Sequence, residues 1–234
     1  MSEIDKTPLQ AILTGKIAPL GDRNVPSGIN KRVVKGPVWL STTGFVGDHQ
    51  GDTKVHGGPD KAVHHYPRDH YASWCQEIGN HPLLASAGAF GENLSTYGLT
   101  EETVALGDVF RLGNAVVEVS QGRQPCWKLN SRFGVNTMAY QVQKTGRTGW
   151  YYRVLEEGEV SSGDILERIE RPLQDWPLRR LWQILYVKIL DRDELEQMAA
   201  LEKLPDGWRR YAQRRLASGK VEDWDRRLKG DKPV

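Results

Sequence analysis

The chain has 234 residues, of which 38% are hydrophobic and 26% charged, and its mean hydropathy is -0.56. No stretch approaches the roughly 18 apolar residues of a membrane span, and the two early acidic residues predict no secretory signal. Thirty-two basic and 30 acidic side chains leave a net charge of +2, which excludes a polycation built for nucleic acid. Two cysteines, Cys75 and Cys126, are too few for a disulfide framework, so we expect a cytoplasmic protein.

The charge is unevenly distributed and indicates two domains. Residues 1–170 carry 17 basic and 19 acidic side chains, whereas residues 171–234 carry 15 basic and 11 acidic ones. Glycine also becomes rare after Gly163. We therefore predict one domain over residues 1–170, a smaller one over 171–220, and a C-terminal tail over 221–234.

The first domain reads mainly as β-strands. Segments rich in β-branched and aromatic residues lie between turn signals at residues 9–17, 37–41, 61–66, 108–112, 115–120, 150–155 and 165–169. The Gly113-Asn114 pair predicts a hairpin between the fourth and fifth of them. Helices are expected only near residues 71–78 and 137–144. Many short strands with few helices favour a mainly β fold, a distorted closed β-barrel.

The second domain reads as three short helices, with apolar stripes at residues 178–185, 195–199 and 208–216. Proline at the start of the first and third helices and Gly219 after the last one support these limits. The third helix also carries four arginines, which are Arg209, Arg210, Arg214 and Arg215. They form either a solvated face or a docking surface for an acidic partner.

Familiar motifs for nucleotide binding, serine hydrolysis or zinc proteolysis are absent from the sequence. Four of the six histidines lie between His49 and His65. His64 and His65 are adjacent on a predicted strand and so point to opposite faces, and no paired motif of zinc spacing accompanies them. We therefore expect hydrogen-bonding roles for these histidines.

Two glycine-containing loops could carry chemistry. In the first, Gly57-Gly58 would let backbone amides approach an anion, and Lys61 and Arg68 could complete a phosphate site. The same residues could also form a plain turn. In the second, residues 90–94, a glycine and an amide lie between strand-like runs, and a β-bulge with a buried polar pair explains them equally well.

A third loop, residues 120–130, contains Cys126 between Arg123 and Lys128. Nearby cations favour the thiolate, which is the form that binds metals or attacks electrophiles. A lone cysteine can equally be a small buried apolar residue. Cys75, on the apolar stripe of a predicted helix, is assigned to packing.

Taken together, these loops resemble the MOSC domain, which is named for the C-terminus of molybdenum cofactor sulfurases, and the bacterial YiiM type in particular. The resemblance covers nearly the whole chain and includes a three-helix module after the domain. It is carried by Gly47-Asp48, His56-Gly57-Gly58-Pro59-Asp60-Lys61-Ala62-Val63, Tyr66-Pro67, Phe90-Gly91-Glu92-Asn93-Leu94, Gly107-Asp108, and Val119-Ser120-Gln121 followed by Arg123, Pro125, Cys126, Lys128 and Leu129.

This resemblance implies a distorted β-barrel that binds the molybdenum cofactor, a pterin dithiolene with a phosphate group and one molybdenum atom. It implies that Cys126 is the metal ligand and the catalytic residue. The residues expected to bind the cofactor are His56, Gly57, Gly58, Lys61, Arg68, Asn93, Arg123 and Lys128. Gly122 departs from the family pattern, in which proline is expected, and this change loosens the loop without altering the spacing from Arg123 to Cys126.

The implied activity is the reduction, and so the detoxification, of N-hydroxylated compounds of the hydroxylaminopurine or amidoxime type. No flavin or haem motif is present, so we expect a separate flavoprotein electron donor, with neither nucleic acid nor membrane as partner. Two alternatives remain open. The protein could carry the cofactor or sulfur without turnover, or it could bind a phosphate-bearing ligand such as pyridoxal phosphate, with Lys61 as the nucleophile.

Overall fold

The computed structural model describes residues 5–52 and 57–230. The strands are β1 (Lys6–Pro8), β2 (Ala11–Thr14), β3 (Ala18–Leu20), β4 (Val25–Ser27), β5 (Arg32–Val33), β6 (Val38–Ser41), β7 (Gly44–Phe45), β8 (Val63–His65), β9 (Leu94–Ser95), β10 (Val109–Leu112), β11 (Ala115–Gly122), β12 (Trp150–Glu156), β13 (Gly158–Val160) and β14 (Ile165–Glu170). The helices are η1 (Pro59–Lys61), α2 (Asp69–Ile78), η2 (Pro82–Ala85), α3 (Lys128–Phe133), α4 (Met138–Thr145), α5 (Leu178–Tyr186), α6 (Arg192–Ala199), α7 (Asp206–Ser218) and α8 (Asp225–Lys229).

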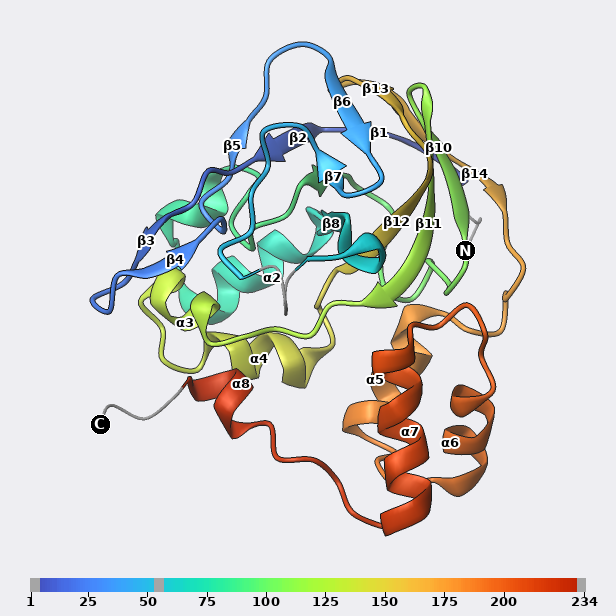
Figure 1. The fold of residues 1–234 in the computed structure, drawn as a ribbon. Coiled ribbons are helices and arrows are strands. Elements are labelled where there is room, and N and C mark those ends of the chain that lie inside the picture. The colour runs from blue at the N-terminus through green and yellow to red at the C-terminus, as the bar shows by residue number, and fades with distance from the viewer. Residues whose placement is uncertain (1–4, 53–56, 231–234) are drawn as a thin grey trace.

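A curled nine-stranded sheet in the order β1-β14-β10-β11-β12-β8-β9-β2-β5 forms the body of the protein (Figure 1). The N-terminal segment connects its two sides, because the Leu9 amide donates to Asp164 O and the Gln10 amide to Ser95 O, both at 2.9 Å. The predicted hairpin is present, with Leu112 opposite Ala115. The mainly β, distorted barrel fold with a C-terminal helical part is therefore confirmed.

Several elements differ from the sequence prediction. Lys61 lies in the 3-10 helix η1 rather than on a strand, because Pro59 starts a turn before β8. Helix α3 begins two residues after Cys126. Helix α8 lies in residues 221–234, which were predicted to be a tail, and its Leu228 is 7% exposed. Apolar burial of Leu228 explains why this short segment is helical.

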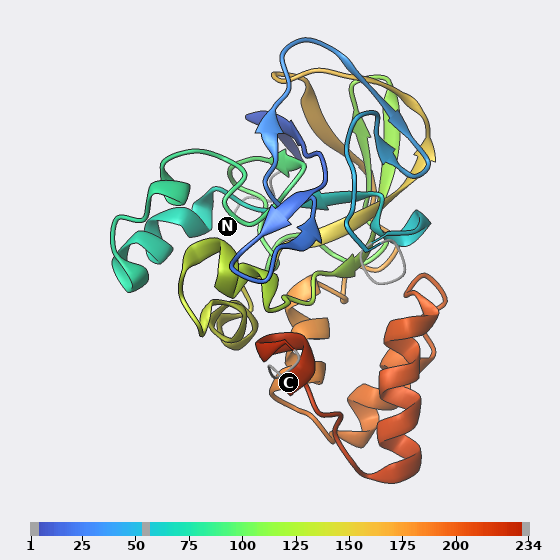
Figure 2. The ribbon, with the colours of Figure 1, turned by 60° about the vertical axis from the view of Figure 1, so that its left-hand side comes forward.

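The C-terminal helices α5, α6 and α7 pack below the sheet, and α8 returns to the side of α3 and α4 (Figures 1 and 2). One continuous apolar core joins the inner face of the sheet to these helices, as shown by Val119 of β11, Leu181 of α5 and Trp208 of α7. A second core lies between α2, α3, α4 and α8. The domain limits given above stay a prediction. The apolar core continues across the predicted boundary at residue 171.

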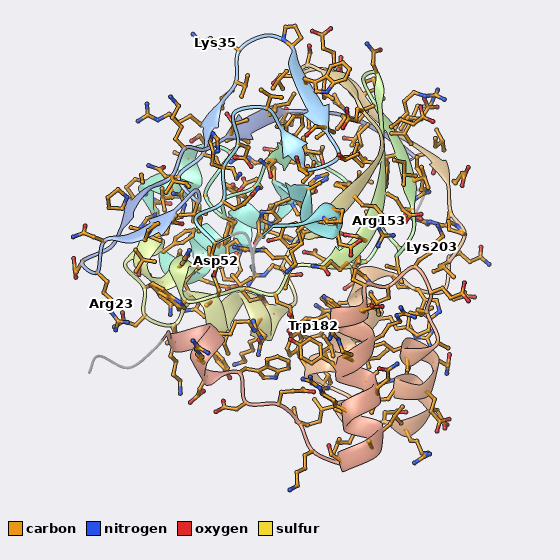
Figure 3. All side chains as sticks on the ribbon, in the orientation of Figure 1. Arg23, Lys35, Asp52, Arg153, Trp182 and Lys203 are labelled. Atoms are coloured by element: carbon orange, nitrogen blue, oxygen red, sulfur yellow. The ribbon has the colours of Figure 1, made fainter. Side chains whose placement is uncertain are left out.

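An ionic contact fastens the helical part to the sheet. Glu118 on β11 binds Arg153 of β12 and Lys203, which precedes α7. Arg153 also donates to Lys203 O at 3.1 Å. Figure 3 shows Arg153 and Lys203 at this junction, and Trp182 at the other contact, where its Nε1 donates to Gln143 O at 2.6 Å. In the part of the chain that the structure describes, no helix has the length and apolar character needed to cross a membrane.

Candidate functional site

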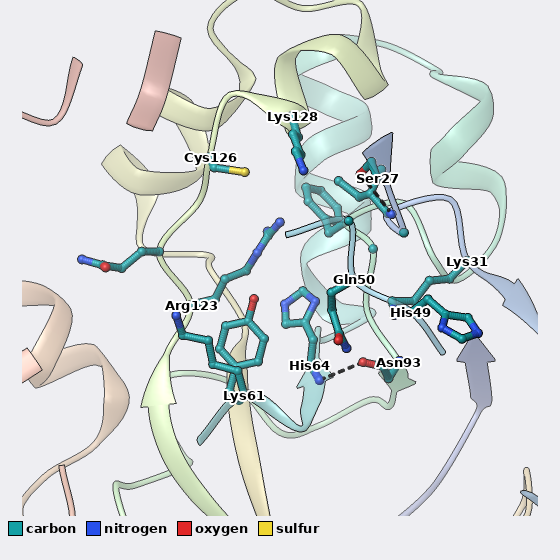
Figure 4. A pocket seen from close by; sticks show the side chains of 17 residues that line it. Ser27, Lys31, His49, Gln50, Lys61, His64, Asn93, Arg123, Cys126 and Lys128 are labelled. Atoms are coloured by element: carbon teal, nitrogen blue, oxygen red, sulfur yellow. Dashed lines mark hydrogen bonds between the residues drawn. The ribbon is translucent and has the colours of Figure 1, made fainter. Parts of the chain in front are cut away.

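A cavity that is partly open to solvent lies where β8, β12 and the loop after β11 meet (Figure 4). Five of the residues expected to bind the cofactor or metal line it together, namely Lys61, Asn93, Arg123, Cys126 and Lys128. The Cys126 Sγ, the Lys128 Nζ and the Arg123 guanidinium point into the same space. Residues far apart in the sequence therefore converge as one site.

Each of these side chains is placed by a short element. Arg123 follows the last residue of β11, where its amide donates to Gly149 O at 2.9 Å. Lys128 is the first residue of α3, and His64 lies in the middle of β8. The loop after a long strand and the start of the following helix thus present four cavity residues within six positions, which are Arg123, Gln124, Cys126 and Lys128.

Close backbone packing shapes the cavity wall. A Cβ added at Gly28 would lie 1.8 Å from His49 O, and one added at Gly51 would lie 2.2 Å from Pro26 O. Gly91 has φ 75°, and a Cβ there would meet Ile29 Cγ1 at 2.6 Å. Gly28 and Gly51 require glycine because the neighbouring segments touch at the backbone, and Gly91 requires it because of its positive φ and the adjacent Ile29 side chain.

The cavity has a positive lining that the protein leaves partly unpaired. His64 is 5% exposed, Arg123 7% and Lys128 9%. His64 Nε2 and Arg123 Nη1 are buried without a hydrogen-bond partner in the structure. Burial, and then the charge of Arg123, hold the pKa of His64 well below its ordinary value, so this ring is neutral at pH 7. Burial also lowers the pKa of Lys61.

Asn93 is tied into a buried polar network beneath the cavity. Its Nδ2 donates to Asp48 Oδ2 at 2.8 Å and to Leu13 O at 3.0 Å, while its Oδ1 accepts from the His64 amide at 3.0 Å. Asp48 also accepts from the Lys31 ammonium. The network therefore fixes the position of the Asp48 loop relative to β8. Asn93 has this structural role in addition to the predicted contact with the cofactor.

The buried Glu92 carboxylate fixes the conformation of the second glycine-containing loop, residues 90–94. This carboxylate is fully buried and accepts from Tyr71 OH at 2.5 Å, the Gly88 amide at 2.6 Å and the Phe90 amide at 3.0 Å. Three donors on one carboxylate fix the turn that brings Gly91 to the cavity. The loop is therefore a built support for the cavity wall.

Three of the predicted cofactor residues are not brought to this cavity. Gly57 and Gly58 do not line it, and the backbones of Gly28 and Gly51 are there instead. The Arg68 guanidinium lies over the ring of Tyr71, 4.1 Å from its centroid, because Arg68 precedes α2 and turns toward that helix. We therefore remove Arg68 from the candidate site. His56 lies outside the described residues.

Sequence reasoning missed several lining residues, which are Ser27, Lys31, His49, Gln50, His64 and Tyr151. The histidine cluster was the available signal for two of them, and the pairing of β8 with β12 brings Tyr151 opposite His64. The contribution of the segment around β4 had no local signal, since it depends on the close contact of residues 26–28 with residues 49–51.

A wider groove opens beside the cavity and shares six of its residues, which are Gly51, Lys61, Gln124, Cys126, Lys128 and Tyr151. Its far wall comes from the C-terminal part, with Tyr211 of α7, Trp224, and Arg226 and Arg227 of α8. Cys126, which is half-buried, lies where cavity and groove join. Among the described residues, no three or more His, Cys, Asp or Glu side chains gather as a metal site.

Comparison with known proteins agrees with this arrangement. The model of the MOSC domain matches residues 52–167, and that of the YiiM-like 3-alpha helix domain matches residues 176–219. Protein YiiM of Escherichia coli (strain K12) is 43% identical over 94% of this chain and 97% of its own. The crystal structure of YiiM from Escherichia coli superposes with a TM-score of 0.80 at 38% identity, covering 95% of this chain and 98% of that one.

A third similar protein carries a functional name. A protein of Gibberella moniliformis (strain M3125 / FGSC 7600) named Reductase is 38% identical over 76% of this chain, and the match covers 32% of its own length. Two matching domain models in this order, and a relative similar over almost its full length, settle the family. The chain belongs to the MOSC domain family, in the YiiM-like form that carries the 3-alpha helix domain.

Proposed function

We propose that this protein is a molybdenum cofactor-binding reductase of N-hydroxylated compounds. The observation that carries the proposal is the cavity itself, in which a half-buried thiol and two buried, unpartnered nitrogens, His64 Nε2 and Arg123 Nη1, face one space. Membership of the MOSC family, which is associated with this cofactor, and the similar protein named Reductase support the same conclusion.

The residues present fit a phosphate-bearing, metal-containing group. Arg123, Lys61 and Lys128 would donate charge-assisted hydrogen bonds to the phosphate, which are the strongest kind available to a buried anion. The Cys126 thiolate would be the soft ligand for molybdenum. The partly unpaired lining supports this assignment, because a buried polar atom without a partner costs free energy, and an anion bound in the cavity would supply a partner for Arg123 Nη1.

Reduction of R–NHOH to R–NH2 and water consumes two electrons and two protons. The bound cofactor supplies the two-electron removal of oxygen. The chain itself orients the cofactor: an anion beside His64 would raise the pKa of this ring and favour a proton on Nε2, from where it can be donated to the anion.

The groove supports a route for the substrate to Cys126. Trp224 lies 5.1 Å from the Tyr211 ring and 5.9 Å from the Tyr186 ring, both edge to face, which gives the far wall an aromatic character. A flat conjugated substrate can pack against such a wall while its N–OH group reaches the thiol end. Both hydroxylaminopurines and aromatic amidoximes meet this description.

A separate flavoprotein is proposed as the electron donor, and the surface of α7 is the proposed docking place. The four arginines of that helix are not equivalent. Arg210 and Arg214 are exposed, Arg209 pairs with Asp206, and the Arg215 side chain is fully buried. Arg215 is therefore withdrawn from the docking surface, because its buried guanidinium forms an ion pair with Glu222 inside the helical part.

An anaerobic assay tests the proposal. The purified chain, loaded with cofactor and reduced by viologen, should convert a hydroxylaminopurine and an amidoxime to the amine and the amidine. A protein that holds molybdenum and pterin but produces neither product would be a carrier, and the reductase proposal would be rejected. Borohydride trapping of pyridoxal phosphate on Lys61 would instead indicate the Schiff-base enzyme.

A further inference from the structure

The C-terminal segment holds the loop that carries Cys126 from both sides. Arg227 Nη1 donates to the carbonyl oxygen of Pro125, and the Arg227 carbonyl accepts from the Trp127 amide at 2.8 Å. A single residue thereby restrains, through its side chain and its main chain, the residue before Cys126 and the residue after it. This contact spans about a hundred positions of sequence.

Arg227 is itself anchored by the rest of the fold. Its Nη2 donates to Gln143 Oε1 of α4 at 2.5 Å and lies 3.5 Å from Tyr186 OH of α5. Its guanidinium also lies 4.8 Å from the ring centroid of Trp224. Because the guanidinium is planar and rigid, the acceptors on α4 and α5 that hold it also set where the Pro125 carbonyl can lie.

Neighbouring residues of the same segment extend the restraint. Asn130 Nδ2, on α3, donates to Leu228 O at 2.9 Å. Gly230 packs so closely on the Trp127 ring that a Cβ there would lie 3.2 Å from it. Leu228 is 7% exposed and belongs to the second core. The segment is therefore docked against the start of α3, directly after Cys126.

We propose that Arg227 is a positioning residue of the site, which fixes the Cys126 thiol at the junction of cavity and groove. This role lies outside both matched family regions, since the second of them ends at residue 219. It rests on the proposed function only where Cys126 acts as metal ligand, because the placement of the thiol is a property of the chain alone. Residues 221–230 are thus part of the site.

The test measures thiol reactivity in the cofactor-free chain, in a Cys75→Ala background so that Cys126 is the remaining cysteine. Arg227→Met removes the donors and keeps the length of the side chain. We expect the rate of Cys126 alkylation by iodoacetamide in this variant to differ at least about fivefold from the rate in the Cys75→Ala parent at the same pH, over pH 6 to 9. Such a difference corresponds to about 1 kcal/mol of lost restraint. Lys229→Met, on the exposed side of the same helix, should leave the rate unchanged.

Gln143→Leu provides a second variant if Arg227→Met does not fold. It removes the carboxamide that anchors Arg227 and leaves the Gln143 carbonyl, which binds Trp182, in place. A folded variant with the reactivity and pH profile of Lys229→Met would overturn the positioning role. If reactivity changes as expected but no form of the chain retains molybdenum, the proposed function fails while the positioning role stands.

Discussion

Two buried arginines lie in different regions of the molecule and differ in how far their guanidinium nitrogens find hydrogen-bond partners in the protein. Arg215, in the C-terminal helical part, has a fully buried side chain that donates to Glu222 Oε2 at 2.8 Å and to Leu185 O at 3.0 Å. Arg123, at the cavity, is 7% exposed and leaves Nη1 without a partner. The first arginine is satisfied by the protein and supports its fold. In the proposed function, the second arginine binds the anionic group of the cofactor.

The largest effect is expected at the cavity thiol. Cys126→Ser should abolish reduction of N-hydroxylated compounds and change thermal stability little, because the replacement is nearly isosteric and the site is half-buried. Cys75→Ser, on α2, should keep the activity and cost about 1 kcal/mol of stability where its sulfur packs on the second core. Full activity of Cys126→Ser with molybdenum still bound would contradict the assignment of the ligand.

The two arginines should separate stability from binding. Arg215→Met should lower the free energy of unfolding by about 3–5 kcal/mol, because it leaves Glu222 and several carbonyl oxygens without their donor. Arg123→Met should change stability by less than about 1 kcal/mol but weaken cofactor retention by about 1.5–3 kcal/mol. Urea unfolding and dialysis of the loaded protein measure the two quantities. Equal loss of stability in both variants would remove the distinction drawn between the regions.

Acid should destabilise the cavity side of the barrel. Burial lowers the pKa of His65 to about 3 and that of His64 well below 6.5, so the unfolded chain binds more protons below pH 6.5. The free energy of unfolding should fall by about 1.4 kcal/mol per histidine for each pH unit below 6.5. Urea melts at pH 7 and pH 5 give the slope, which His65→Gln should reduce. A stability that does not change over this interval would show that these rings are not held neutral.

The smallest effect concerns the surface of the helix that contains Arg215. Replacing the exposed Arg210 and Arg214 by glutamine should slow electron transfer from a protein donor about two- to fivefold at low salt, since steering by exposed charge is modest and screened. Activity with reduced viologen should stay unchanged. A rate from the donor that is the same in both proteins at every salt concentration would move the docking surface elsewhere.

Local signals in the sequence predicted what depends on neighbouring residues. The hairpin at Gly113-Asn114, the helix α2 and the three C-terminal helices all appear where turn residues and apolar spacing placed them. The lining residues Lys61, Arg123, Cys126 and Lys128 were also found, through the motifs that resemble MOSC domains. Short contiguous patterns therefore carried most of the fold and the centre of the site.

What could not be predicted depends on contacts between distant segments. The two-residue strands β5, β7 and β9 exist because of their partners, and nothing in such short stretches specifies pairing. The cavity is lined by Gly28 and Gly51 instead of the predicted Gly57 and Gly58. This difference follows from contacts between segments more than twenty residues apart in the sequence. The hydrogen bond from Arg227 to Pro125 likewise has no local signal, so local patterns predict only a tail for the C-terminal segment.

The cofactor content of the chain tests the central claim most directly. Protein purified without oxygen and desalted should contain about one molybdenum atom per chain together with the fluorescence of an oxidised pterin, and the Arg123→Met, Cys126→Ser double variant should contain neither. Arg215→Lys, measured beside it, controls for a general loss of stability. Wild-type protein with no more molybdenum and pterin than the double variant, after reconstitution with excess cofactor, would contradict the account of the cavity.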